Sequence, residues 1–251
     1  MPSLVTIGAD PEVFLRNGAT IVSAIGHVGG SKDAPVPVQC GAVQEDNVLA
    51  EFNIDPAASE DQFVTNIKTV MGQLRERVQP FDIEVISSHR FTKHELMRSG
   101  RKALLFGCDP DFNAYTGAKN VPPSARTGLR TAGGHVHVGY SGHSEQRNRE
   151  IAINMDLLLG VPSVLLDSDT DRRSMYGKAG CLRHKPYGME YRSLSNFWLA
   201  HTDVIRWVYR QAVLAASYTC TANEELLQRC INESDTTLAE KLVSEFNINM
   251  P

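Results

Sequence analysis

Residues 130–142, RTAGGHVHVGYSG, decide how the middle of this chain folds. His135 and His137 follow two glycines and are separated by one valine. In a β-strand, residues two positions apart point to the same face, so both imidazoles share one face and Val136 and Val138 enter a core on the other. Imidazole binds metals and can donate to phosphate or carboxylate. The spacing alone fits equally well an ordinary core histidine beside a solvent-facing one, so the rest of the chain has to decide.

The bulk composition is that of an ordinary globular protein. The 251 residues are 42% hydrophobic and 22% charged, and the formal net charge of −4 provides no basic field for nucleic acid. The five cysteines are scattered without a C-x-x-C motif, which favours reduced thiols. The apolar runs are too short to span a bilayer, and the first residues lack the pattern of a signal peptide. We therefore predict a cytoplasmic protein, with residues 1–251 as a single domain.

Alternating and helical patterns succeed one another along the chain. A hairpin about Asp46–Asn47 joins two strand-like runs, and apolar residues at helical spacing predict a helix over residues 59–78, with Ser59 as its N-cap. Further expectations are a strand at 81–87, a loop at 106–128, a helix at 144–160, a strand at 187–194 and helices from about 196 onward. The chain is therefore predicted to be an α+β protein with a mainly antiparallel sheet flanked by helices.

Acidic residues occupy three strand-like segments where a strand would hold them rigidly. Each pair alone fits the solvated face of a half-buried strand, but bulky apolar neighbours such as Phe52 and Tyr191 indicate burial. Buried carboxylates need cations, and oxygen ligands with one or two imidazoles suit Mg²⁺ or Mn²⁺ better than zinc. The acidic residues in question are Asp10, Glu12, Glu45, Glu51 and Glu190.

A dense basic segment follows, between residues 172 and 192. Arginine forks match phosphate oxygens, so acid-lined metals beside arginines predict phosphoryl chemistry. The chain has no phosphate-binding loop of the G-x-x-x-x-G-K-[ST] type. The nearest stretch, GHVGGSKD at residues 26–33, is interpreted as a flexible turn, with phosphate contact through Lys32 as the alternative. The cations of the basic segment are Arg172, Arg173, Lys178, Arg183, Lys185 and Arg192.

The order of these motifs resembles the glutamine synthetase and glutamate–cysteine ligase superfamily. More closely, it is similar to the phage carboxylate–amine ligase (amidoligase) family, from about residue 5 to residue 210. The motifs that carry the resemblance are GADPEVF at 8–14, EFN at 51–53, GGHVHVGY at 133–140 and RRSMYGKAGCLRHKPYGMEYRSLSNFW at 172–198.

The resemblance implies a curved antiparallel sheet that forms a funnel-shaped active site for ATP and two divalent metals. It implies one metal held by Glu12, Glu45 and Glu51, with Gln44 or Asp46 as alternatives to Glu45 one residue away. It implies a second metal held by Asp10, His135 and Glu190. Asp10 departs from the family, which more often has glutamate there. His137 is implied to contact nucleotide phosphate or substrate, and Lys185 to contact the nucleotide. Arg183 and Arg192 are implied to clamp the phosphoryl group, with Arg172 or Arg173 assisting.

The implied reaction is ATP-dependent amide formation through an acyl phosphate, with Mg²⁺ or Mn²⁺. The expected partners are a carboxylate and an amine, as small molecules or peptide groups, in the host cytoplasm if the chain is phage-encoded. Neither a membrane nor a nucleic acid read by sequence is expected, and a homo-oligomer is compatible. Two other classes stay open: a metal-dependent hydrolase of amides or nucleotides, and a binding module without activity.

Overall fold

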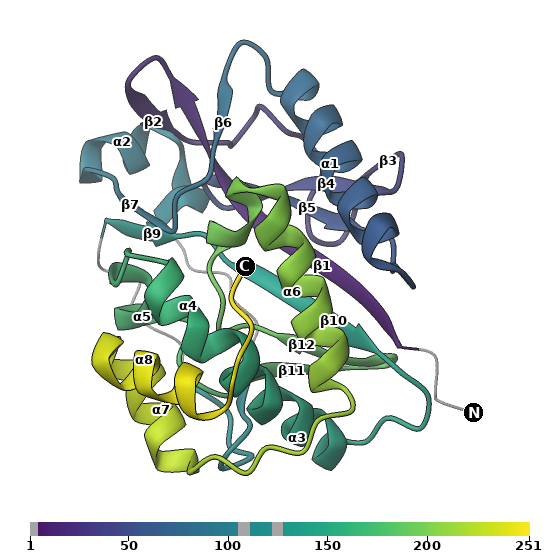
Figure 1. The fold of residues 1–251 in the computed structure, drawn as a ribbon. Coiled ribbons are helices and arrows are strands. Elements are labelled where there is room, and N and C mark those ends of the chain that lie inside the picture. Colours follow the sequence, from purple (N-terminus) through teal and green to yellow (C-terminus); the bar gives the residue numbers. More distant parts are fainter. Residues whose placement is uncertain (1–4, 105–110, 122–127) are drawn as a thin grey trace.

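The computed structural model of the chain describes residues 5–104, 111–121 and 128–251 (Figure 1). Its strands are β1 Thr6–Asn17, β2 Thr20–Val22, β3 Val36–Val38, β4 Gly41–Asp46, β5 Leu49–Ile54, β6 Asp82–Glu84, β7 Ser88–Arg90, β8 Phe112–Asn113, β9 Leu129–Thr131, β10 Gly134–Gly139, β11 Cys181–Lys185 and β12 Gly188–Tyr191. The α-helices are α1 Glu60–Arg77, α2 Lys93–Arg98, α3 Glu145–Met155, α4 Val161–Leu166, α5 Asp171–Met175, α6 Thr202–Ala215, α7 Glu224–Glu233 and α8 Thr236–Glu245. Short 3-10 segments occupy Arg101–Leu104 and Asn196–Ala200, and a π-helical turn occupies Asp156–Gly160.

The long strand β1 organises the sheet. The strand order is β3-β4-β5-β1-β10-β12-β11-β8, and the end of β1 also pairs with β2 and β6. Every strand pair within the described residues is antiparallel. The predicted α+β class and mainly antiparallel sheet are therefore confirmed, whereas the funnel shape stays a prediction.

The two faces of the sheet differ in chemistry because side chains alternate along each strand. One face is apolar: Ile7 and Val13 of β1 and Val136 and Val138 of β10 are fully buried. Helices α1, α3 and α6 pack on this face and are seen in front of the sheet in Figure 1. The opposite face, called the inner face below, carries the polar residues of β1, β4, β5, β10, β11 and β12.

A small second core closes the inner face near the end of β1. Phe14 follows Glu12 on that face and is fully buried, in one apolar cluster with Leu49, Phe91 and Leu96. Phe91 lies next to the β7–β9 pair, and Leu96 lies on α2. Beyond Phe14 the inner face is therefore filled by apolar side chains, and the polar part of the face is confined to the rest of the strands.

Most predicted elements are confirmed. Helix α1 begins after Ser59, whose hydroxyl accepts from the amide of Gln62, and α3 begins after Ser144, whose hydroxyl accepts from the amide of Arg147. The hairpin at Asp46–Asn47 is present as β4–β5, and all elements from Asn196 onward are helical. None of the helices in the described ranges is long and apolar enough to cross a membrane.

The basic segment contains a strand that the sequence analysis did not predict. Cys181–Lys185 forms strand β11, which pairs with β12 across a turn at Pro186 and Tyr187. Its alternation places Leu182 in the apolar core and two cations on the inner face, so apolar periodicity alone does not reveal it. The loop expected at 106–128 lies partly outside the described residues, and the described part holds β8.

The glycine that opens β10 is predicted to be indispensable for stability. A Cβ on Gly134 would lie 2.2 Å from the carbonyl oxygen of Ser195 and 2.4 Å from Nε1 of the buried Trp198. We expect Gly134→Ala to lower the free energy of unfolding by about 3 kcal/mol, because backbone has to move. Gly72→Ala is the control: nothing lies within 4 Å of its Cβ position in α1, so alanine should stabilise by about 1 kcal/mol. Urea denaturation measures both, and equal midpoints would contradict the prediction.

Candidate active site

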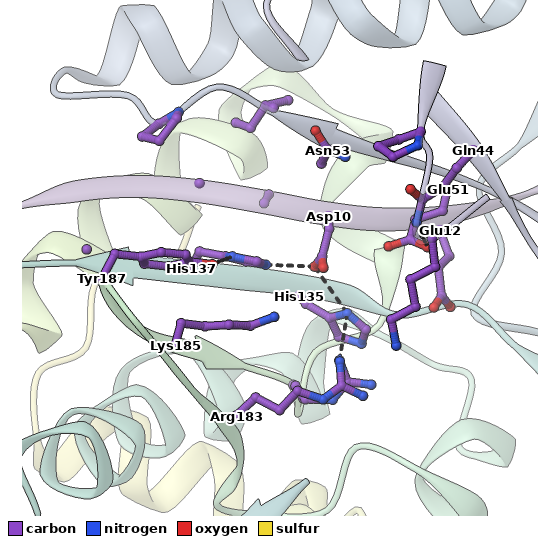
Figure 2. A pocket seen from close by; sticks show the side chains of 18 of the residues that line it. Asp10, Glu12, Gln44, Glu51, Asn53, His135, His137, Arg183, Lys185 and Tyr187 are labelled. Carbon is purple, nitrogen blue, oxygen red and sulfur yellow. Dashed lines mark hydrogen bonds and ion pairs between the residues drawn. The ribbon is translucent and has the colours of Figure 1, made fainter. Parts of the chain in front are cut away.

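The inner face of the sheet borders a cavity of about 560 Å³ (Figure 2). Its volume lies within the range of ordinary small-molecule sites. Strands from both halves of the sheet contribute, together with a turn between β2 and β3. The polar and charged residues that line it are Thr6, Asp10, Glu12, Lys32, Gln44, Asp46, Glu51, Asn53, His135, His137, Arg183, Lys185, Tyr187 and Arg192.

The strand register brings the two histidines to Asp10. Asp10 lies opposite His135 in the β1–β10 ladder, and His137 lies one pleat further along on the same face. The Asp10 Oδ1 atom is 3.2 Å from His135 Nδ1 and 3.0 Å from His137 Nε2. The expectation that both imidazoles share one face is confirmed, and both face the cavity (Figure 2).

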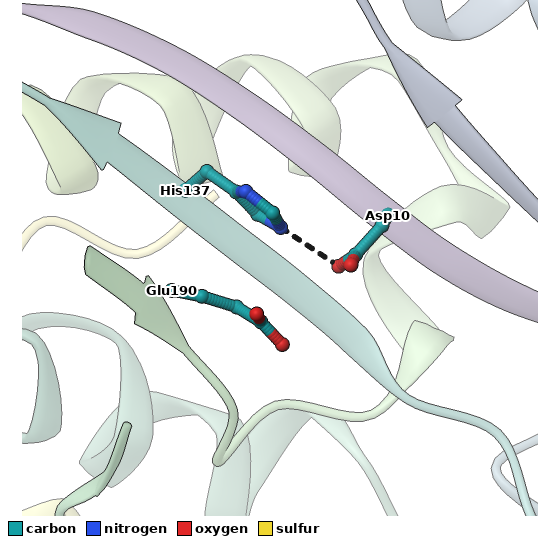
Figure 3. A group of neighbouring side chains, drawn as sticks. All are labelled: Asp10, His137 and Glu190. Atoms are coloured by element: carbon teal, nitrogen blue, oxygen red, sulfur yellow. Dashed lines mark ion pairs between the residues drawn. The ribbon is translucent and has the colours of Figure 1, made fainter. Parts of the chain in front are cut away.

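Asp10, His137 and Glu190 form a group that could hold a metal ion (Figure 3). Their ligand atoms all lie within 4.8 Å of one another. Glu190 arrives from β12, where it pairs with His137 across the ladder. The sequence placed His135 in this group and His137 on phosphate. The geometry instead places His137 among the three donors, with His135 3.6 Å from Glu190 through its Nδ1.

Glu190 has no exposed surface and is surrounded by cations. Its Oε1 lies 3.3 Å from Arg183 Nη1 and is also paired with Arg192 Nη1, and its Oε2 lies 2.7 Å from Lys185 Nζ. Burial and the charge of Asp10 raise the pKa of Glu190, but Arg192 and the histidines outweigh them and lower it to about 2. Glu190 is therefore ionised at neutral pH, and three cationic side chains are held around it.

A second set of carboxylates lines the other half of the cavity. Glu12 lies opposite Glu51 in the β1–β5 ladder, and Asp46 lies nearby at the end of β4. Burial and the charge of Asp46 raise the pKa of Glu12 to about 7. Burial, followed by the charges of Asp10, Asp46 and Glu12, raises the pKa of Glu51 well above its usual value. These carboxylates repel one another, and a bound cation would relieve that repulsion.

The two histidines titrate differently. Burial and the charge of Arg192 lower the pKa of His135 to about 4, so its imidazole is neutral at pH 7. The pKa of His137 is raised, because the charge of Asp10 and a hydrogen bond to it outweigh burial. His137 also contacts Tyr187: its Nδ1 is 2.5 Å from the phenol oxygen, and the two rings are stacked at 6.0 Å.

The structure places Glu45 outside the cavity. Side chains alternate along β4, so Gln44 and Asp46 face the cavity while Glu45 points to the other side. The Glu45 carboxylate accepts from the amides of Gly26 and Gly29, at 2.8 and 3.1 Å. Of the two acidic residues, Asp46, the alternative with a shifted register, faces the cavity and Glu45 does not.

Arg172 and Arg173 are also placed away from the main cavity. Arg173 donates to the carbonyl and hydroxyl oxygens of Ser163 and lines neither cavity, so it fastens α5 to α4. Arg172 donates to the carbonyl oxygens of Ser193 and Arg192. It lines a second cavity of about 40 Å³ that shares Glu12, His135 and Arg192 with the first. Of these two arginines, Arg172 alone borders one of the two cavities, and the assisting role of either stays a prediction.

Sequence reasoning missed two residues of the site. Asp111 lies in the smaller cavity, and its Oδ2 is 3.4 Å from Arg192 Nε. Tyr187 forms the β11–β12 turn and borders the main cavity. A hairpin of β11 and β12 would have a two-residue turn at Pro186 and Tyr187. Recognising this hairpin in the sequence would have placed Tyr187 near His137. Asp111 follows the undescribed residues 105–110, and no motif marks it.

A buried carboxylate supports the strands from behind. Asp156, in the π-helical turn, has no exposed surface and accepts from Tyr191 at 2.6 Å and from Tyr115 at 2.8 Å. Tyr191 stands between Glu190 and Arg192 in the chain and points to the opposite face. Burial raises the pKa of Asp156 to about 7, although the tyrosine hydrogen bonds lower it.

An α+β protein whose buried carboxylates, imidazoles and guanidinium groups meet in one cavity has the side chains of an enzyme that handles charged substrates. Residues 117–239 match the family described as Phage phiEco32-like COOH.NH2 ligase-type 2. This match supports the resemblance to phage-type carboxylate–amine ligases that the sequence motifs carry. No curated protein shows significant similarity to the chain.

The matched segment contains only one half of the cavity. It includes His135, His137 and Glu190, whereas Asp10 and Glu12 lie on β1, outside it. The antiparallel ladder between β1 and β10 joins the two halves. The cavity is therefore lined both by residues of the matched segment and by residues of β1 that lie outside it.

The contribution of Asp156 to the free energy of unfolding should depend on pH. Because the pKa of Asp156 is about 7 in the folded protein and near 3.8 in an exposed aspartate, the folded state keeps a proton that the unfolded chain releases. The stability from this proton is present at acidic pH and is lost as pH rises from about 4 to 7. We expect the unfolding free energy of the wild type, relative to Asp156→Asn, to fall by about 2 to 3 kcal/mol between pH 5 and pH 7.5. Urea titrations at both pH values measure it, and a constant difference would refute the raised pKa.

Proposed function

We propose that the chain is an ATP-dependent carboxylate–amine ligase that forms an amide through an acyl phosphate, with divalent metal ions. One observation carries the proposal: Asp10 and His137 line a cavity together with Arg183, Lys185 and Arg192, and the buried Glu190 behind it completes the donor group and is paired with all three cations. Carboxylates and imidazole beside a cluster of cations suit the handling of phosphates and a divalent metal. The family match supports the carboxylate–amine chemistry.

The donor atoms fit Mg²⁺ or Mn²⁺. Asp10, His137 and Glu190 would hold one ion, and Glu12, Asp46 and Glu51 would hold another. The raised pKa values of Glu12, Asp46 and Glu51 support the second assignment, since buried carboxylates that repel one another attract a cation. Ions held by these residues would neutralise negative charge on the phosphate oxygens.

The cations of β11 and β12 have a defined part in the proposed reaction. An oxygen of the substrate carboxylate attacks the γ-phosphorus of ATP, the bond to the bridging oxygen breaks, and ADP leaves with the electron pair. Arg183, Lys185 and Arg192 stabilise the charge on the phosphoryl oxygens and keep their own protons. The product of this step is an acyl phosphate, whose carbonyl carbon is electrophilic, whereas the original carboxylate did not react with amines.

The second step forms the amide. The lone pair of the amine nitrogen attacks the acyl carbon, the bond to the phosphate oxygen breaks, and inorganic phosphate leaves with the electron pair. The nitrogen then loses a proton to solvent. The buried position of Glu190 and His135 limits water at the carbonyl, which favours the amine over hydrolysis.

The substrates are proposed from the size and charge of the cavity. About 560 Å³ accommodates a nucleotide with small acids and amines, or with the reacting groups of peptides. We propose such partners in the cytoplasm, where ATP and Mg²⁺ are available, and no nucleic acid or membrane among them. A homo-oligomer is compatible with this proposal.

Phosphate release from ATP tests the proposal directly. Purified full-length protein with Mg²⁺ or Mn²⁺ is assayed across a panel of carboxylic acids and amines. We expect release only when one acid and one amine are both present, because both are needed to complete the reaction. Release without an amine acceptor would favour a nucleotide hydrolase. Absence of both ATP turnover and ATP binding would contradict the ligase and leave the metal hydrolase as the leading candidate.

Removing the charge of Glu190 should abolish turnover. Glu190→Gln keeps the shape but removes one metal donor and the partner of three cations, so we expect phosphate release to fall at least about 100-fold and Mn²⁺ to bind more weakly. Glu150→Gln, on the outer surface of α3 beside Arg147, is the matched control and should retain activity. Circular dichroism checks that both variants are folded. Full activity in folded Glu190→Gln would exclude the proposed site.

A further inference from the structure

The turn between β2 and β3 lies at the edge of the main cavity and is held there by Glu45. Lys32 and Pro35 of this turn line the cavity. One oxygen of Glu45 accepts from the amides of both Gly26 and Gly29. From the other side, Arg77 of α1 donates to the carbonyl oxygen of Val28. A strand and a helix thus anchor the same turn.

The backbone of this turn is specified by glycines. Gly26, Gly29 and Gly30 have φ values of +85°, +74° and +74°, a region that favours glycine. Reciprocal backbone hydrogen bonds between Ser31 and Ala34, at 3.1 and 3.0 Å, close the tip, so Lys32 stands at the end of a tight turn. This geometry differs from the flexible turn predicted from the sequence.

Lys32 supplies positive charge from the acidic side of the cavity. Arg183, Lys185 and Arg192 all come from β11 or from the end of β12. Among the described lysines and arginines that line the cavity, Lys32 alone comes from elsewhere, and its charge acts on the carboxylate of Asp46. A polyphosphate in the cavity would therefore meet cations from two opposite sides.

We propose that the glycine turn forms a phosphate subsite, in which Lys32 contacts the terminal phosphates of the nucleotide and Glu45 is a positioning residue. The inference rests on the proposed function and adds to it the residue that binds from the acidic side. The Lys32 ammonium keeps its proton and neutralises charge on the phosphoryl oxygens. Glu45 acts through the turn: its oxygen fixes two amides and so the position of the lysine.

Nucleotide binding to the full-length protein tests the subsite. Calorimetric titrations with Mg²⁺ and AMP, ADP, ATP or tripolyphosphate are compared for wild type and Lys32→Ala. One charge-assisted contact predicts that ATP and tripolyphosphate bind about tenfold to hundredfold more weakly to the variant, ADP less so, and AMP equally well. Lys32→Arg should recover most of the loss. Lys32 is exposed, so its removal should leave the melting temperature unchanged.

Lys68→Ala is the matched control, because it removes the same charge from the exposed side of α1. It should bind ATP as the wild type does. Equal ATP affinity in Lys32→Ala and wild type would overturn the phosphate subsite while the ligase proposal stands. If the wild type itself binds neither ATP nor tripolyphosphate, the proposed function falls and the subsite with it.

Two variants of Glu45 separate positioning from metal binding. Glu45→Gln keeps an oxygen acceptor for the amides of Gly26 and Gly29, whereas Glu45→Ala removes it. We expect Glu45→Ala to bind ATP as weakly as Lys32→Ala does. Glu45→Gln should bind ATP with an affinity within about threefold of the wild type. Both Glu45 variants should bind Mn²⁺ alone as the wild type does. Weaker Mn²⁺ binding by Glu45→Gln would make Glu45 a ligand and refute its positioning role.

Discussion

The constraint on which the structure depends is a fully buried carboxylate in the middle of a sheet. Glu190 stays ionised because Arg192 and the two histidines outweigh its burial, and Arg183 and Lys185 are paired with it as well. An unpaired carboxylate at this position would cost roughly several kcal/mol of desolvation free energy. The β11–β12 register places Arg183 directly opposite Glu190. A slip of one residue would send these charges into the apolar core, so the register and the site specify each other.

The apolar face maintains this arrangement from behind. Tyr191, between two charged neighbours in the chain, is anchored by its hydrogen bond to Asp156 in the π-helical turn. Gly160 in the same turn leaves room for the phenol, since a Cβ there would lie 2.7 Å from the hydroxyl oxygen. The hydrogen bond between Tyr191 and Asp156 thus aligns β12, which carries Glu190, although neither side chain lines the cavity. The irregular turn in the helix is explained by this packing.

The sequence predicted what periodicity and capping can encode. Helices α1 and α3, the β4–β5 hairpin and the shared face of His135 and His137 were all readable, because each is set by local spacing. Strand β11 was not, since its charged residues are half-buried through pairing with Glu190 on the neighbouring strand, which leaves no apolar pattern in the sequence. Glu45 was misplaced by one residue, and only the observed pairing of β4 with β5 decides which acidic residues face the cavity. The pairs Asp10–Glu12 and Glu190–Arg192 could be predicted from their spacing of two residues. Their contacts with other strands could not be predicted from the sequence.

The placement of β1 has a consequence for synthesis of the protein on the ribosome. Asp10 is made early, yet its ladder partner is His135 and the third donor of its group is Glu190. A nascent chain shorter than about 190 residues therefore holds acidic strands without their cationic neighbours, and it cannot assemble the cavity. Contacts so distant in sequence also form slowly in general. The cavity is therefore completed only after β12 has emerged.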